Sequence, residues 1–294
     1  MLKKVICYGE MLWDCFPNRE VPGGAPMNVA LHLSQLGLSV KMISSVGNDA
    51  KGSQLLDFIR TFPVDLSLIQ KDPQHPTGTV IVNDLDPQNV KYEIVSPSAW
   101  DNIQWNPGLQ EAVSEADALI FGSLAARCET SRETLHHLLD TDTLKIFDIN
   151  LRPPFVDMDH LKPLIEKANI LKINEDELDW MAEHIGLKGS WEHIAEKVSQ
   201  QFDLAMVCVT LGSKGAFIYK KGEITMHSGF KVKVKDTVGA GDAFLGGFVY
   251  GYLNEKKPKE LLDFACGLGA LVASKSGGTP TYHQEDIHNI IEGR

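Results

Sequence analysis

The sequence predicts an α/β protein in which helices cover both faces of a mostly parallel sheet, with a small β-sheet lid beside it. The strand-like segments are continuous apolar runs, as expected for strands buried on both faces. Helical patterns lie between successive runs, which indicates that crossover helices join the strands. Residues 77–96 differ, because two alternating segments flank a polar, proline-containing turn with no helix between them. That pattern is typical of a β-hairpin.

The predicted strands are, in chain order, KKVICYGEM, VKMISSVG, ALIFGSL, LKIFDIN, NILKIN and LAMVCVTLG. The predicted helices between them are APMNVALHLSQLG, KGSQLLDFIRTF, SRETLHHLLD, EDELDWMAEHIG and WEHIAEKVSQQF. The first of these helices shows the pattern well. Val29, Leu33 and Leu36 share one face, Pro26 stands early where its missing N–H costs nothing, and Gly37 ends the helix.

The hairpin is expected to stand off the main sheet, because alternating strands have one covered face and one wet face. Together with the short segment 12–22, residues 77–98 would form the lid. Two helical patterns, 240–254 and 258–276, end the chain and are separated by the polar EKKPK. The sequence shows no internal repeat or low-complexity tract, so residues 1–294 are expected to form a single domain.

Composition and charge narrow the class of protein. The net charge is −11 and there is no long Lys/Arg run, which argues against a nucleic-acid partner. No apolar stretch approaches the length that spans a bilayer, and the N-terminal run carries Glu10, unlike a signal peptide. The five cysteines show no CxxC spacing, and Cys7 and Cys208 fall inside strand-like runs. These features favour a cytoplasmic protein without membrane contact.

The stretch KDTVGAGDAFLGGF carries the first candidate site. Gly239, Ala240 and Gly241 leave backbone exposed just before a predicted helix, and such loops bind anions through free N–H groups. Asp242 then places a carboxylate where an anion would bind. Taken alone, Asp242 is also explained as a cap or first-turn carboxylate that favours the helix dipole. The P-loop, dinucleotide, zinc-protease and G-x-S-x-G motifs are absent from the sequence.

A second candidate stretch is PGGAPMNVA. Gly23 and Gly24 permit close backbone approach, and Asn28 falls in the first turn of the following helix, where its amide could reach a ligand. A tight turn into a capped helix explains the same residues. Just upstream, Asp14 is interpreted as lying at the end of the first strand, a usual place for ligand contact in α/β folds, although simple solvent exposure is the alternative.

Polar side chains also follow three later strands. The three clusters, in chain order, are Asp148, Asn150 and Arg152; Lys172, Asn174 and Glu177; and Thr210, Gly212 and Gly215. Each cluster alone is explained by a turn or a cap. Their shared position is the informative part, because ligands in open α/β sheets bind along the carboxyl edge of the strands. The sequence therefore predicts one composite site at that edge.

On these residues the sequence resembles the ribokinase, or PfkB, family of carbohydrate kinases. The family's GG-x-x-x-N-x-A stretch corresponds to Gly23 through Ala30, and its D-T-x-G-A-G-D stretch to Asp236 through Asp242. The resemblance runs in order along the chain and includes VGNDAKG, NEDE and VTLGSKG. It implies a ribokinase-like α/β/α sandwich with a β lid, and transfer of the γ-phosphoryl group of ATP to a sugar or nucleoside hydroxyl with Mg²⁺.

The resemblance also implies roles for single residues. Asp242 would be the catalytic base, and the backbone N–H groups of Gly239, Ala240 and Gly241 would form an anion hole. The residues implied to bind sugar are Asp14, Gly23, Gly24, Asn28 and Arg152. Those implied at the nucleotide are Lys172, Asn174, Thr210, Gly212, Gly215 and Gly269, with Glu177 holding Mg²⁺ through water. Many members bind a monovalent cation such as K⁺, whose ligands here would be backbone or hydroxyl oxygens of Asp236, Val238, Val272, Lys275, Gly277 and Thr281.

Subfamily detail favours fructose as the sugar. GGAPMNVA and DINLRP are similar to fructokinase motifs, whereas kinases of 2-keto-3-deoxygluconate commonly carry an Arg where this chain has Val95. No Arg occurs in 77–100, although Arg152 could serve an anion, and KYEIVSPSAW departs from the usual fructokinase hairpin. A ribokinase-type activity and a non-catalytic sugar or nucleotide sensor remain alternatives; the sensor would be expected to lack Asp242. The apolar alternation in TVIVND and VKYEIV would permit a homodimer through the lid.

Overall fold

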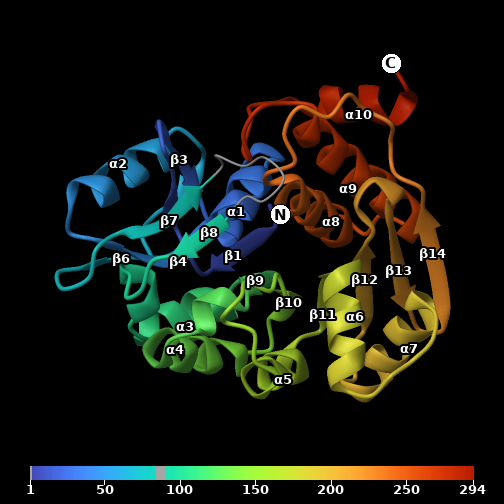
Figure 1. Ribbon diagram of the computed structural model, residues 1–294, viewed down its shortest axis with the longest axis horizontal. Helices are drawn as coiled ribbons and strands as arrows, with labels where there is room; N and C mark the ends of the chain where they lie inside the picture. Colours follow the sequence, from blue (N-terminus) through green and yellow to red (C-terminus); the bar gives the residue numbers. More distant parts are fainter. Residues whose placement is uncertain (1, 84–90) are drawn as a thin grey trace.

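A ten-stranded sheet runs through the centre of the molecule in the computed structural model, which describes residues 2–83 and 91–294 (Figure 1). The strand order is β14-β13-β12-β11-β10-β9-β1-β4-β5, and β6 also pairs with β4. The pairings from β12 to β5 and β6 are parallel, whereas β13 and β14 are antiparallel. The strands are β1 (Lys4–Tyr8), β4 (Ser39–Gly47), β5 (Val64–Asp65), β6 (Ile69–Asp72), β9 (Ala118–Gly122), β10 (Leu144–Asp148), β11 (Ile170–Asn174), β12 (Met206–Thr210), β13 (Ala216–Lys220) and β14 (Glu223–His227).

Helices cover both faces of this sheet, as the continuous apolar runs predict. In β1, Ile6 and Tyr8 belong to one buried cluster, while Val5 and Cys7 belong to the cluster on the other face. The first face is covered by α3 (Pro107–Ser114), α4 (Glu129–Leu139), α5 (Met158–Lys167), α6 (Glu175–His184) and α7 (Trp191–Gln201) (Figure 1). The second is covered by α1 (Ala25–Gln35), α2 (Ala50–Ile59), α8 (Ala240–Leu253) and α9 (Pro258–Ala273), and α10 (Gln284–Glu292) packs on α9.

Some elements are absent from the sequence prediction, and their residues explain why. Helix α5 contains Pro163, which works against a helical assignment. Helix α10 fully buries only Ile287, so its apolar pattern is weak. Strand β14 is mostly exposed and depends on pairing with β13 rather than on burial. Helix α3 and the short strands β5 and β6 are likewise not predicted.

A separate small sheet is built from the segments that the sequence predicts for it. Its order is β3-β2-β7-β8, formed by β2 (Leu12–Phe16), β3 (Arg19–Gly23), β7 (Gly78–Asn83) and β8 (Lys91–Ile94). The turn of the predicted hairpin lies outside the described residues. Leu12, Val80 and Val82 form a small buried cluster in this sheet. Asp14 lies in the middle of β2, so the expectation that it ends a strand of the main sheet is wrong. The chain crosses into the small sheet before that point.

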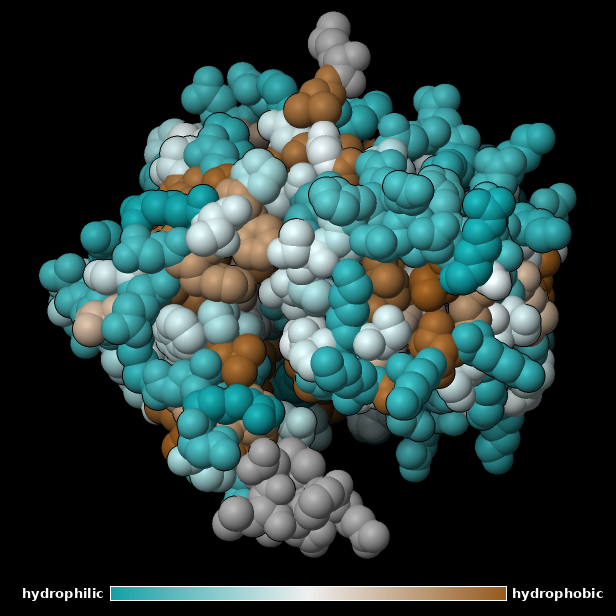
Figure 2. Space-filling model, turned by 90° about the horizontal axis from the view of Figure 1, so that it is seen from above, coloured by the Kyte–Doolittle hydropathy of each residue, from teal (hydrophilic) through white to brown (hydrophobic). Residues whose placement is uncertain are grey.

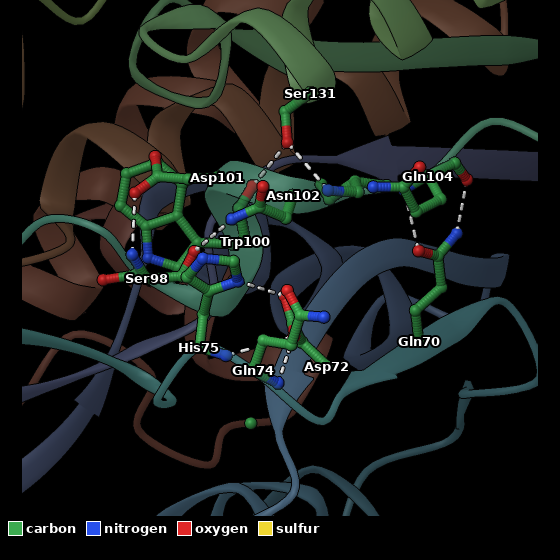
Figure 3. Close-up of polar contacts among 12 residues, drawn as sticks. Gln70, Asp72, Gln74, His75, Ser98, Trp100, Asp101, Asn102, Gln104 and Ser131 are labelled. Atoms are coloured by element: carbon green, nitrogen blue, oxygen red, sulfur yellow. Dashed lines mark hydrogen bonds and ion pairs between the residues drawn. The ribbon is translucent and has the colours of Figure 1, made fainter.

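Local polar contacts order the chain just before β7 and just after β8 (Figure 3). Before β7, the Asp72 carboxylate accepts the backbone N–H of Gln74 and pairs with His75 Nδ1 at 2.8 Å. After β8, Asp101 Oδ2 accepts the Ser98 N–H at 2.9 Å. These contacts give the two segments that flank the small sheet a defined local structure.

Among the described residues, none of the helices has the length and apolar character needed to cross a membrane. All five cysteines are free thiols. The surface seen from above is mostly hydrophilic, with apolar side chains gathered in separate patches (Figure 2).

Candidate active site

The carboxyl ends of the parallel strands bring the predicted clusters to one edge of the main sheet. Asp148 is the last residue of β10, and Asn174 and Thr210 are the last residues of β11 and β12. Asn174 and Thr210 are also partners in the β11–β12 register, so their strands end side by side. Parallel strands direct all these ends the same way, as the sequence pattern predicts.

The amino end of α8 supplies open backbone at this edge. Gly239 is the N-cap with φ +74°, a left-handed conformation, and a Cβ there would collide with the Cα of Gly278. Only glycine satisfies both conditions. The first amides of a helix have no partner four residues earlier and so face outward. The Ala240 N–H is already engaged by the Thr237 carbonyl at 3.2 Å, which leaves Gly241 and the residues around it as the freer donors.

Asp242 does not cap α8. It is the third residue of the helix, no side chain caps this end, and its Oδ2 accepts a hydrogen bond from Asn28 Nδ2 at 2.8 Å. Asn28 lies in the first turn of α1, so the two motifs meet across a separation of 214 residues. Burial raises the pKa of Asp242, and the nearby Asp148 adds to the shift, while Asn28 and Lys172 oppose it. The carboxylate is thus held in place with one oxygen engaged and a raised proton affinity.

Behind the first turn of α8 lies a buried ion pair. Lys172 Nζ contacts the two carboxylate oxygens of Asp148 at 2.9 and 3.1 Å, and both side chains are less than one-tenth exposed. Burial disfavours the ammonium, but Asp148 and Glu177 keep the pKa of Lys172 above its ordinary value. A Cβ at Gly241 would lie 3.9 Å from Nζ. The positive charge therefore stands next to the open amides.

Glu177 joins α6 to the loop that carries Arg152. Asn174 and Glu177 form a capping box, with Glu177 Oε2 accepting the Asn174 N–H at 2.9 Å and Asn174 Oδ1 accepting the Glu177 N–H at 2.8 Å. Glu177 Oε1 accepts the Leu151 N–H at 2.8 Å. Burial raises the pKa of Glu177, and Lys172 counteracts the shift. Each oxygen keeps a lone pair for water, so the residue suits a magnesium ion held through water.

The described residues contain no group of three or more His, Cys, Asp or Glu side chains placed to hold a metal ion directly. Magnesium ordinarily keeps several waters and binds through one or two carboxylates together with substrate phosphates. The arrangement around Glu177 is compatible with that mode of binding.

The opposite side of the site is rich in carboxylates. Glu10, which follows β1, is 3% exposed and its Oε2 has no hydrogen-bond partner among the described residues. Burial raises the pKa of Glu10 to about 7 and that of Asp14 to about 6. In both cases Asp242 adds to the increase and Arg152 opposes it, so these four groups lie close enough to interact. A Cβ at Gly24 would collide with the Glu10 carbonyl, so the PGG segment packs directly on this region.

The remaining residues predicted to bind the nucleotide lie in two places, after β12 and in α9. Gly212 begins a short 3₁₀ helix after β12 and Gly215 ends it, at the same edge as Thr210. Gly269 lies where α9 crosses α8, since a Cβ there would lie 3.2 Å from the Ala240 carbonyl oxygen and 3.4 Å from Phe244 Cβ. Gly269 thus permits close packing of the helix that begins at the open amides.

The residues named for a monovalent cation lie just before α8, in the last turn of α9 and in the loop after α9. Asp236 Oδ1 accepts the Val238 N–H at 3.0 Å, and Oδ2 accepts the Gly277 N–H at 3.1 Å. The Lys275 N–H bonds to the Val272 carbonyl at 2.9 Å. The Lys275 Nζ donates to the Thr281 carbonyl at 3.1 Å. The six predicted residues thus form two hydrogen-bonded groups, one around Asp236 and one around Lys275.

His32 is a residue that the sequence reasoning missed. It is fully buried, with Nε2 3.0 Å from the Gly278 carbonyl and Nδ1 3.1 Å from the Tyr282 hydroxyl. Burial lowers the pKa of His32 to about 4, so the ring is neutral, and the carbonyl assigns the proton to Nε2. The spacing between Asn28 and His32 is the sequence signal from which His32 could have been predicted. His32 follows Asn28 by four residues and shares its face of α1.

Two cavities lie at opposite edges of the sheet. A small one touches the site and is lined by Ala25, Pro26, Val29, Ile120, Phe121, Gly122, Asp148, Asn150 and Leu245. A larger one of about 440 Å³ is lined by Lys3, Met206, Lys220, Tyr252, Leu253, Glu255, Lys256, Pro258 and Leu261. Met206 begins β12, which places the larger cavity at the amino edge of the strands, away from the clustered polar groups.

A comparison with models of known protein families assigns the chain to one family. Residues 3–285 match the model of the pfkB family carbohydrate kinases. The chain belongs to this family. The protein is therefore a carbohydrate kinase, and its predicted ribokinase-like fold with a mostly parallel sheet and a separate small sheet is confirmed.

Relatives of this PfkB kinase include two sugar kinases. A sugar kinase of Pyrococcus horikoshii is 31% identical over 286 residues, covering 93% of this chain and 87% of the relative. A fructokinase of Escherichia coli is 27% identical over 310 residues, covering 94% and 95% of the two chains.

Several solved structures of kinases are also similar to this chain. A fructokinase of Vibrio cholerae with fructose, ADP and calcium bound aligns with a TM-score of 0.84 at 25% identity, covering 99% of each chain. The P. horikoshii kinase in complex with ATP aligns with a TM-score of 0.81 at 28% identity, covering 97% of this chain and 99% of that one. A 2-dehydro-3-deoxygluconokinase of Thermotoga maritima, at 19% identity and a TM-score of 0.88, shares the fold.

Proposed function

We propose that this PfkB kinase transfers the γ-phosphoryl group of ATP to a hydroxyl of fructose. The observation that carries the proposal is the pairing of Asp242 with Asn28 beside the open amides of α8. It supports the assignment of Asp242 as a base of raised proton affinity beside an anion site. Similarity to fructokinases, one of them solved with fructose and ADP, supports the choice of substrates.

In the proposed mechanism, Asp242 accepts the proton of the attacking sugar hydroxyl. The hydrogen bond from Asn28 fixes one carboxylate oxygen and leaves the other for the substrate. The raised pKa of Asp242 increases its strength as a base, and general base catalysis typically contributes about 10²–10⁴-fold in rate.

Charge on the transferring group would be stabilised by the end of α8. The backbone N–H groups around Gly239 and Gly241 and the Lys172 ammonium behind them form a positive region fixed by the fold. Preorganised donors of this kind stabilise the transition state without reorganisation. Magnesium, when bound, adds positive charge at the phosphates, and Glu177 is the residue proposed to hold it through water.

The carboxylates opposite suit a neutral, hydroxyl-rich sugar. Glu10, Asp14 and Asp242 all interact with Arg152, so carboxyl groups outnumber the one guanidinium. The nearby Arg127 does not change this balance, because it forms a bidentate pair with Asp101 at 2.7 and 2.8 Å and both are about 1% exposed. A carboxylate-bearing sugar would meet net repulsion, whereas sugar hydroxyls can donate to Asp14. The site therefore favours fructose over 2-keto-3-deoxygluconate.

The test is ADP release with ATP and Mg²⁺ over a panel of fructose, ribose, 2-keto-3-deoxygluconate and adenosine. Fructose is expected to give the highest kcat/KM. A higher value for the acidic sugar would overturn the substrate assignment. ATP binding without turnover of any panel member would instead favour a sensor.

The Asp242→Asn variant tests the role of the base. We expect kcat to fall by about 10²–10⁴-fold while sugar affinity stays nearly unchanged, because Asn keeps the shape but cannot accept the proton. Asp286→Asn is the matched control, since Asp286 is also the third residue of a helix, α10, and lies outside the site. If Asp242→Asn mainly lowers thermal stability and the control does the same, Asp242 acts in the helix end rather than in catalysis.

A further inference from the structure

Arg127 is a buried cation that the proposed mechanism does not use. It follows η2 (Leu124–Ala126), a short 3₁₀ helix after β9, and its side chain is about 1% exposed. Its Nε and Nη2 donate to the Asp101 carboxylate at 2.7 and 2.8 Å. A buried ion pair is by itself weak evidence for stability, because apolar side chains of similar volume often pack as well. The other contacts of Arg127 indicate what else the side chain does.

The guanidinium of Arg127 lies over two aromatic rings from different parts of the chain. Its Cζ is 4.1 Å from the ring centroid of Trp100 and 4.6 Å from that of Phe155. Trp100 belongs to η1 (Ala99–Asn102), the 3₁₀ helix that follows the small sheet, whereas Phe155 lies between β10 and α5. Cation–π contacts of this kind hold ring and guanidinium at a defined separation. Arg127 therefore connects two segments that have no sequence neighbourhood.

The same side chain reaches both strands of the β7–β8 hairpin. Val95 follows β8, and its N–H donates to the Thr79 carbonyl of β7 at 3.0 Å, so it still pairs within the small sheet. Its carbonyl accepts Arg127 Nη2 at 2.9 Å. A Cβ on Gly78, at the start of β7, would collide with Trp100 Nε1, so the ring under the guanidinium packs against that strand.

Phe155 connects Arg127 to the turn that carries Arg152. The Phe155 N–H donates to the Arg152 carbonyl at 2.9 Å and closes a four-residue turn whose central residues, 153–154, are both proline. Two prolines leave the turn little backbone freedom, so the ring and Arg152 move together. The Arg152 guanidinium counteracts the rise that burial causes in the pKa of Asp242, the proposed base, so its placement matters at the site.

We propose that Arg127 is a positioning residue that sets the turn of Arg152 and the exit strand of the small sheet relative to the body of the protein. It acts on the turn through Phe155 and on the strand through Val95. Arginine suits this role because its planar fork donates along its edges while its faces stack on aromatic rings, which lysine cannot do. The inference rests on the proposed function in that Arg152 is taken to contact the sugar.

Phe155→Leu tests the link between Arg127 and Arg152 while the buried ion pair stays intact. For the panel sugar with the highest kcat/KM, we expect its KM to rise about three- to tenfold, with kcat and the KM for ATP within about twofold of wild type. Phe155→Tyr should restore the sugar KM, because the aromatic face is kept. Phe62→Leu is the matched control, since Phe62 is also half-buried and packs on another ring, that of Phe58, at the end of α2.

A double-mutant cycle separates positioning from general damage. If Phe155 acts through Arg152, Phe155→Leu should raise the sugar KM by less than about twofold in an Arg152→Met background. An equal rise with and without Arg152 would overturn the proposal. So would an equal rise in the KM for ATP, or a tyrosine variant that behaves like the leucine variant.

Arg127→Lys tests the hub itself. It keeps a charge beside Asp101 but loses the forked contacts, so the sugar KM should rise at least as much as in Phe155→Leu. If it fails to fold, Arg127→Leu combined with Asp101→Asn replaces it, because both charges are then removed. A wild-type sugar KM in the folded variant would contradict the proposal. Where no panel sugar is phosphorylated, the proposed function fails, whereas the same comparisons of sugar affinity by calorimetry still test the role of Arg127.

Discussion

At the scale of single residues, Glu10 is a polar group buried at an energetic cost. It is 3% exposed, its Oε2 lacks a partner among the described residues, and burial raises its pKa to about 7. Such a group destabilises the ionised folded state and persists only where the fold or the function requires it. Its pKa is lowered by Arg152 and raised by Asp242, two of the residues proposed to act at the sugar.

Glu10→Gln should change how stability depends on pH. Because the folded pKa of about 7 exceeds the ordinary 4.5, the folded state binds the proton more tightly. The stability that protonated Glu10 contributes to the folded state is fully present below pH 4.5 and is lost as the pH rises through 7. The wild type should therefore lose up to about 3 kcal/mol more than Glu10→Gln between pH 4.5 and 8, measured by urea unfolding. Exposed Glu129→Gln should follow the wild type; identical curves for all three would refute the prediction.

At the scale of elements, α1 connects both halves of the proposed phosphoryl-transfer site. Asn28 in its first turn bonds to Asp242, and His32 one turn later bonds to Gly278. A Cβ on Gly246 of α8 would lie 2.9 Å from His32 Cβ, so the two helices pack closely at this point. The helix thus sets the position of the base and of the loop behind the anion site together.

The His32→Leu substitution should weaken the attachment of the loop that contains Gly278 to helix α1. Removing the ring leaves the Gly278 carbonyl without its partner, at a cost of about 1–3 kcal/mol, and leaves the Tyr282 hydroxyl only its bond to the His32 backbone carbonyl at 3.4 Å. We expect kcat to fall and the KM for ATP to rise, while the KM for sugar changes little. His32→Gln should recover much of the loss, because its amide can still donate to Gly278. Equal damage by both variants would indicate a purely structural role.

At the scale of the whole molecule, the small sheet is less firmly packed than the body. Its buried cluster contains Leu12, Val80 and Val82, whereas the two faces of the main sheet bury large clusters. Its contacts with α2 include the ion pair of Lys51 and Glu20 at 2.6 Å and the bond from Trp13 Nε1 to the Lys51 carbonyl at 3.1 Å. Few buried contacts imply low local stability, as expected of a lid.

Hydrogen exchange should show this difference. Amides of β2 and β7 are expected to exchange at least about tenfold faster than those of β1 and β9 in the free protein. Fructose together with a non-hydrolysable ATP analogue should slow exchange in the small sheet and leave the central strands unchanged. Protection of β2 equal to that of β9 before ligand is added would show that the small sheet does not act as a lid.

The sequence by itself determined the fold class and the edge at which the polar clusters meet. Apolar runs of strand length can only be buried on both faces, and parallel strands direct their carboxyl ends to one edge. The glycine and asparagine motifs also predicted which segments border the site. The position of Asp14 was misplaced, because local pattern does not show when a chain leaves one sheet for another.

The tertiary structure decided which residues touch. The bond between Asn28 and Asp242 spans 214 residues, and that between His32 and Gly278 spans 246. Both depend on how α1 packs against α8, which no local periodicity encodes. Short-range preferences select the elements, whereas the chemistry of the site depends on long-range packing, where single hydrogen bonds and charges are brought within reach.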